Sequence, residues 1–251
     1  MKQQPITGSE SKNDLLRYFL CRLERFGEFE IPLVILLIVV LVVVGIILSS
    51  IAAGKRQEAF KKLASSLGMI FYPGNDYSYD ERYSFINKLC QGKNRYAFNI
   101  VRGDYRGYAI QLFDYHYETH STDSKGKRKK HHHYFSFFIL QFGRNFPELV
   151  IAREGWFSKI AQWFGYADID FESVEFSRKF IVRSPDKKFA YDICHVQMIE
   201  YMLQNSDLSI EIERDCLTLF FPRRLTLEQI VPNLDRLIEI REMFPRYLME
   251  S

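Results

Sequence analysis

The chain has few cysteines, and none of them has the spacing of a common metal or redox motif. The four cysteines are Cys21, Cys90, Cys194 and Cys216, and no two of them form a C-x-x-C pair. This spacing excludes a zinc ribbon and a thioredoxin-like redox site. An uncharged run separates Cys21 from the other three, and an odd number of thiols cannot pair completely. We therefore expect reduced cysteines, which are typical of the cytosol.

The short motifs of several enzyme classes are also missing. The sequence contains no G-x-G-x-x-G, no Walker A segment, no G-x-S-x-G and no H-E-x-x-H. These motifs serve dinucleotide binding, nucleotide binding, serine nucleophiles and catalytic zinc, respectively. We therefore predict no catalytic residue and no cofactor, and we favour a protein without enzymatic activity.

Charge is absent from one long apolar run, IPLVILLIVVLVVVGIILSSIAA, over residues 31–53. These 23 residues contain no charged side chain. They would extend about 34 Å as a helix, which is enough to cross the hydrocarbon core of a bilayer. A cleaved signal peptide would have a shorter apolar region nearer the start, and a soluble helix would keep a polar stripe. We predict a transmembrane helix over 31–53, in an integral membrane protein with a single span.

The predicted span divides the chain into three parts: a polar segment over 1–30, the transmembrane helix over 31–53, and a soluble domain over 54–251. Within the first part, the sequence SKNDLLRYFLCRLERF has leucine and phenylalanine at helical spacing, with arginines mostly on the opposite side. This pattern predicts an amphipathic helix that lies on a membrane surface or packs against a partner.

Basic residues flank the span almost equally, so the orientation rests on small differences. Three arginines lie within fifteen residues before the run, whereas Lys55 and Arg56 almost abut its end and Lys61 and Lys62 follow. Because cytoplasmic flanks carry an excess of lysine and arginine, and because the cysteines are expected to be reduced, we predict a cytoplasmic C-terminal domain.

The soluble domain shows both strand and helix signals, without the regular alternation of a parallel sheet. We expect a helix that follows the span and ends at Gly68, and a final helix that begins at a capping box of Thr226 and Gln229 and is kinked at Pro232. Another helix is expected to start with Ser184 as its cap and to end near Asn205. The other expected elements are strands at 96–102, 108–119, 134–142, 149–152 and 176–184, an aromatic helix at 155–165, and a hairpin at 208–213 and 217–221. The predicted fold class is α+β, an antiparallel sheet with flanking helices.

Three segments carry a resemblance to a known group of proteins. They are FDYHYET at 113–119, PELVIARE at 147–154 and DIDFESVEFSRKFIV at 168–182. In this order after a single span, they resemble a family of uncharacterised bacterial single-pass membrane proteins with a C-terminal soluble domain. The family has no assigned activity, so the resemblance implies a location in the bacterial inner membrane and no catalytic residue.

Positive charge is concentrated in DSKGKRKKHHHYFSFF, residues 123–138. The basic residues are Lys125, Lys127, Arg128, Lys129 and Lys130. With Asp123 they sum to +4, whereas the whole chain carries +3. Such a hairpin end can bind anionic lipid headgroups or an acidic surface of a protein partner. Alternatively it is a solvated loop whose charges protect the strand edges. Nothing matches a nucleic-acid-binding module, so nucleic acid is not an expected partner.

Histidines gather in the same region, five of the six lying between His116 and His133. Alternation places Asp114, His116, Glu118 and His120 on one face of the ascending strand. Imidazole suits zinc, copper and nickel, so His120, His131 and His133 are candidate ligands of a metal, and clustered imidazoles can also respond to pH.

Two functions therefore remain open. The first is a membrane-anchored interaction domain whose basic hairpin lies near the membrane surface. The second is a membrane-bound enzyme, or a metal- or pH-sensing domain, centred on the histidine-rich hairpin.

Overall fold

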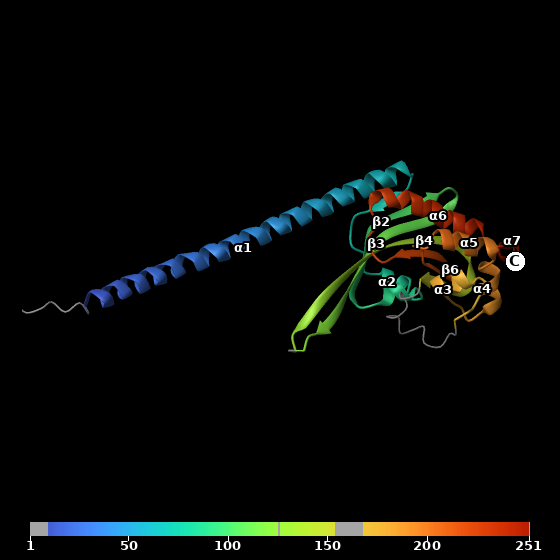
Figure 1. The fold of residues 1–251 in the computed structure, drawn as a ribbon. Helices are drawn as coiled ribbons and strands as arrows, with labels where there is room; N and C mark the ends of the chain where they lie inside the picture. Colours follow the sequence, from blue (N-terminus) through green and yellow to red (C-terminus); the bar gives the residue numbers. More distant parts are fainter. Residues whose placement is uncertain (1–9, 125, 154–167, 251) are drawn as a thin grey trace, which may run out of the picture. The chain divides into compact units, whose positions relative to one another are not determined.

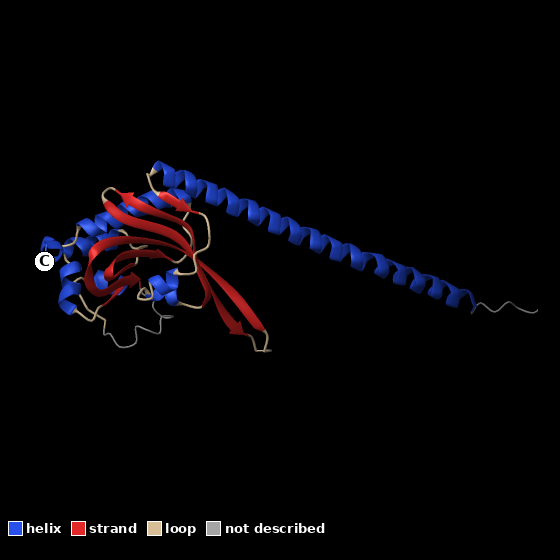
Figure 2. Cartoon of the chain, turned by 180° about the vertical axis from the view of Figure 1, so that it is seen from behind, coloured by secondary structure: helices blue, strands red, loops and turns tan. Residues whose placement is uncertain are grey.

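The computed structural model describes residues 10–124, 126–153 and 168–250, with side chains from residue 33 (Figures 1 and 2). The helices are α1 (Glu10–Ser66), α2 (Tyr79–Arg82), η1 (Asn87–Cys90), α3 (Val174–Lys179), α4 (Lys187–Ile193), α5 (Val196–Gln204), η4 (Leu227–Gln229), α6 (Ile230–Glu242) and α7 (Arg246–Glu250). The strands are β1 (Ile70–Tyr72), β2 (Lys93–Tyr105), β3 (Tyr108–Thr122), β4 (Arg128–Arg153), β5 (Phe180–Arg183) and β6 (Ile210–Phe221). The predicted α+β class with an antiparallel sheet is confirmed.

Helix α1 contains the apolar run and continues without interruption to Ser66. Among the described residues, its stretch Leu33–Ser66 is the one that is long and apolar enough to cross a membrane, which indicates membrane association. By its contacts the chain divides into two compact units, Met1–Arg56 and Gln57–Ser251. Within the second unit, Phe60 and Ala64 of α1 are buried in the core, and the helix ends just before Gly68, as predicted. Gly68 has φ +69°, the left-handed conformation that closes a helix without a Cβ clash.

The sheet is antiparallel throughout, and its central strand is β4. The strands pair in the order β1-β2-β3-β4-β5, and β6 pairs with β4 as well. Strand β4 pairs with three strands along its length: with β3 over residues 128–140, with β6 over residues 136–151, and with β5 over residues 150–153.

Apolar side chains cover both faces of the sheet. On one face, the end of α1 and helices α3 to α6 bury a large core that includes Leu112 of β3 and Leu219 of β6. On the other face, α2 and η1 bury a smaller aromatic core that includes Phe113, Tyr115 and Phe137. Because neighbours along β3 alternate between these two cores, the strand is apolar on both sides where it crosses the domain.

Several predicted elements are corrected by the structure. The two segments predicted as a closing hairpin form the single strand β6, which continues through Arg214 at φ +52°. The strands predicted at 134–142 and 149–152 are both parts of β4. The strand predicted at 176–184 is β5 preceded by helix α3. The aromatic helix predicted at 155–165 lies outside the described residues.

The helix predicted from Ser184 to about Asn205 is divided into α4 and α5. The cap of α4 is Asp186, whose carboxylate accepts from Phe189 N, and not Ser184. Helix α5 begins after His195, whose ring accepts from Met198 N at 3.4 Å and contacts Met243 O at 2.9 Å. A contact with the end of α6 thus breaks the helix that the apolar spacing favoured.

The capping box of Thr226 and Gln229 is confirmed, at the start of η4 and α6. Pro232, where a kink was predicted, lies in the first turn of α6, where its missing N–H is not needed for a helical hydrogen bond.

Candidate functional site: a basic ribbon and a histidine cluster

The β3–β4 hairpin extends beyond the rest of the sheet as two strands. The pairing of β2 with β3 ends at Glu118, and the pairing of β6 with β4 begins at Ser136. Within the described chain, Thr119–Thr122 and Arg128–His131 therefore pair only with each other. We call these two segments the ribbon, and they project from the sheet in both overall views (Figures 1 and 2).

Exposed cations cover the end of the ribbon. The described ones are Lys127, Arg128, Lys129 and Lys130, and all four are exposed. Because side chains alternate along a strand, Arg128 and Lys130 lie on one face and Lys129 lies on the other. The ammonium of Lys130 is 3.5 Å from a carboxylate oxygen of Glu118. Lys125, the fifth predicted contact residue, lies outside the described residues.

The turn that joins the two strands is closed by Asp123. Its carboxylate accepts from Lys127 N at 3.0 Å, and its carbonyl accepts from Gly126 N at 2.9 Å. Gly126 has φ +76°, which glycine adopts without strain. This compact turn therefore fixes the backbone of Lys127, the first of the four described cations, at the end of the ribbon.

The three histidines predicted as metal ligands are divided between the two faces of the hairpin. His120 lies opposite Lys130, on the face of Glu118. On the other face, His131 Nε2 is 2.8 Å from the hydroxyl of Ser121, and His133 Nε2 is 2.8 Å from that of Thr119. The structure therefore does not bring His120 together with His131 and His133.

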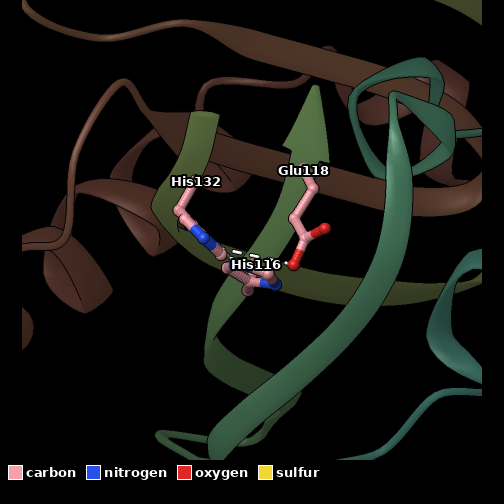
Figure 3. Close-up of side chains that lie close together, drawn as sticks. All are labelled: His116, Glu118 and His132. Carbon is pink, nitrogen blue, oxygen red and sulfur yellow. Dashed lines mark hydrogen bonds and ion pairs between the residues drawn. The ribbon is translucent and has the colours of Figure 1, made fainter. Parts of the chain in front are cut away.

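A different group, His116, Glu118 and His132, converges at the root of the ribbon (Figure 3). His116 Nε2 is 3.0 Å from His132 Nδ1, and that nitrogen is 3.6 Å from Glu118 Oε1. The three ligand atoms all lie within 4.8 Å of one another. His116 and Glu118 are buried, whereas His132 is exposed. Among the described residues, these three side chains have the geometry to hold a metal ion.

The protonation of the two buried groups follows from their surroundings. Burial lowers the pKa of His116, and the nearby His132 acts in the same direction. The pKa of Glu118 is also lowered, first by the hydrogen bond from the Asn94 amide and then by the charge of Lys130. The site thus favours a neutral imidazole beside an ionised carboxylate.

Alternation along β3 already placed His116 and Glu118 on one face, but the identity of the third residue depended on the pairing register. Glu118 lies opposite His132, which puts His132 on the same face and turns His131 and His133 away. A shift of one residue in the pairing register would have placed His131 and His133 on this face and turned His132 away. Had the turn been placed at Asp123, counting the paired residues of the hairpin from that turn would have predicted that His132 lies opposite Glu118.

The fold and the site together define a membrane-associated α+β protein with a basic two-stranded ribbon. No protein-family model matches the sequence, and no curated protein matches it. A solved structure with a similar fold is the crystal structure of the mycobacterial trehalose monomycolate transport factor A, TtfA. The TM-score is 0.53 at 14% sequence identity, and the match covers 75% of this chain and 96% of that chain. At this identity the similarity concerns the fold.

Proposed function

We propose that the protein is a membrane-anchored interaction domain without enzymatic activity, and that its basic ribbon binds anionic lipid headgroups. The observation that carries this proposal is the position of Lys127–Lys130. Four consecutive exposed cations stand at the end of a ribbon that no third strand covers in the described chain.

The expected strength of this contact follows from the charge. A basic residue close to an anionic membrane surface contributes about 1 kcal/mol, and the contribution falls within a screening length. Lys130 contributes less to membrane binding than its neighbours, because its ammonium is 3.5 Å from the Glu118 carboxylate, which partly neutralises its charge. With three full contributions and a smaller one from Lys130, the free energy of membrane binding favours the bound ribbon by about 3 kcal/mol.

The location proposed is a bacterial inner membrane, with the C-terminal domain in the cytoplasm. The basic pair Lys55 and Arg56 beside the apolar run supports this orientation, since positive residues accumulate on the cytoplasmic side. The free thiols of Cys90, Cys194 and Cys216 agree with a reducing compartment. TtfA is named as a transport factor and not for a reaction, which supports a role in binding or assembly.

The proposal is tested with the full chain in lipid nanodiscs. A fluorophore attached to Ser121→Cys in the ribbon, in a chain whose Cys21 and Cys90 are replaced by alanine, donates energy to an acceptor dye on the lipid. Discs with anionic phosphatidylglycerol should show more transfer than discs of neutral phosphatidylcholine. This excess should disappear when Lys127, Arg128, Lys129 and Lys130 are all replaced by glutamine, and also at about 1 M salt, where the screening length is about 3 Å.

The matched control replaces four exposed basic residues elsewhere in the domain by glutamine, namely Lys187, Lys188, Arg223 and Arg246. This variant has the same net charge as the ribbon variant and should keep the excess transfer. Equal transfer in anionic and neutral discs would contradict membrane binding by the ribbon. An acidic surface on a protein partner would then be the next candidate.

A further inference from the structure

At the root of the ribbon, two imidazoles and one carboxylate meet at distances typical of ligands that share an ion. We propose that His116, Glu118 and His132 form a binding site for a transition-metal ion of the zinc class. A tetrahedral zinc ion binds nitrogen and oxygen at about 2.0–2.2 Å, so neighbouring ligand atoms stand about 3.3–3.5 Å apart. The observed separations are 3.0 Å between the imidazole nitrogens of His116 and His132, and 3.6 Å between His132 and Glu118.

His116 is held in the orientation that a metal ligand requires. Its Nδ1 is 3.1 Å from the carbonyl oxygen of Asn94, which can only accept, so Nδ1 carries the proton. The lone pair of Nε2 then points toward His132 (Figure 3). Metal-binding histidines commonly donate their second N–H to a carbonyl in this way. The rings of Tyr96 and Tyr134 pack against the imidazole of His116, with ring centroids 4.6 and 4.8 Å from its own, and so restrict the plane of the imidazole.

Asn94 orients the carboxylate as well as the imidazole. Its side-chain amide donates to Glu118 Oε1 at 2.8 Å. The residue has φ +50° and lies in the irregular part of β2, where the register with β3 shifts between Lys93 and Tyr96. Such bulges redirect groups next to functional sites. Here the bulge lets one residue contact both buried ligands.

The exposed third ligand gives the ion a route to the site. The side chain of His132 is 51% exposed, and that of Lys130, which lies near the other oxygen of Glu118, is 62% exposed. Without an ion, Lys130 offsets the charge of Glu118, and it is free to turn into solvent when an ion replaces it. Three protein ligands leave at least one position for water or for a group from a partner.

The donor set selects the class of ion. Two imidazole nitrogens and one carboxylate suit zinc, copper or nickel, whereas magnesium and calcium require mostly oxygen. Because His116 and Glu118 belong to β3 and His132 belongs to β4, the ion would cross-link the hairpin. The cross-link lies where the supporting strands end, so metal binding would stiffen the ribbon.

The test uses the full chain in detergent, purified with a tag that contains no histidine and treated with a chelator. Titration calorimetry with Zn²⁺ should find one ion per chain. His132→Ala and Glu118→Gln should each weaken binding about 100-fold or abolish it, and Asn94→Ala should weaken it about 10-fold through the lost orientation of the ligands. Co²⁺ bound in place of Zn²⁺ should show visible absorption that the His132 variant loses.

The matched control is His131→Ala, which removes the neighbouring exposed imidazole from the opposite face and should leave the affinity unchanged. Because His132 is exposed, its variant should fold, and circular dichroism of each variant checks this. The proposal is overturned if the wild-type chain binds no Zn²⁺ at micromolar concentration. Equal losses in the His131 and His132 variants would also overturn it, because they would place the ion on the histidines of the ribbon in general. Neither result depends on whether the ribbon binds lipid.

Discussion

Ser136 of β4 lies directly opposite Asp114 of β3, and its hydroxyl donates a hydrogen bond of 2.9 Å to the fully buried Asp114 carboxylate. The same hydroxyl accepts from Leu225 N at 3.0 Å, and Asn99 donates to the other carboxylate oxygen. One serine therefore satisfies two buried groups at the boundary between the apolar core and the histidine cluster.

Replacing Ser136 by alanine should lower the free energy of unfolding by about 1–3 kcal/mol, because it leaves the carboxylate and an amide without this partner. The measurement is denaturant unfolding of the full chain in detergent. Ser209→Ala is the control: Ser209 is also buried, but its hydroxyl has no hydrogen-bond partner in the described part of the chain. Equal effects of the two substitutions would show that the network contributes nothing to stability.

Gly92 should not tolerate alanine. Its φ is +66°, and a Cβ at this position would overlap the carbonyl of Glu118 and the ring of Tyr117. The left-handed conformation costs an alanine about 1 kcal/mol, and the overlap adds to it. Gly107→Ala should show the conformational cost alone, since Gly107 has φ +82° with open space around it. The difference between the two variants then measures the overlap. Thermal unfolding should show a clearly larger loss for Gly92→Ala, and a similar loss at both positions would contradict the close approach of Gly92 to β3.

Glu211 makes stability depend on pH. Burial raises its pKa to about 8, and Glu213 and Glu148 act in the same direction. The folded state therefore holds a proton that the unfolded state releases near pH 4.5, and stability falls as the pH rises from about 4.5 to about 8. Glu211→Gln should raise the free energy of unfolding at pH 8 by at least about 1 kcal/mol and have little effect at pH 4.5. Unfolding curves at both pH values check this, and a gain at pH 4.5 that equals the gain at pH 8 would exclude the ionisation as the cause.

The proposed orientation predicts a cytoplasmic C-terminus. A reporter that is active only in the cytoplasm should be active when fused after Ser251, and a reporter active only outside the cytoplasm should be inactive there. Exchanging Lys55 and Arg56 for glutamine should weaken this preference, because these two cations lie closest to the apolar run. Activity of the external reporter in the wild-type fusion would remove the proposed contact with the cytoplasmic leaflet.

Much of the architecture was predictable because its causes are local in the sequence. The absence of charge over 31–53 predicted the apolar part of α1, and Phe60, Ala64 and Gly68 predicted its buried end and its termination. Thr226 and Gln229 predicted a helix start, since both partners of a capping box lie within one turn. Strand alternation predicted that His116 and Glu118 share a face. Whether residues 11–26 lie on a membrane surface stays a prediction.

Only the tertiary structure decided which residues from distant segments meet. Alternation determines the face of a residue within its strand, but the partner across the hairpin depends on the register, and a slip of one residue exchanges every face. For this reason His132 joins His116 and Glu118, whereas His131 and His133 point away. Likewise, the contact of His195 with Met243 divides a helix that its own apolar spacing favoured, and the bulge at Asn94 places one side chain against both buried ligands. The contacts of His195 and Asn94 join residues that are remote in the chain, so no local pattern could predict them, whereas His132 could be found only with the register of the hairpin.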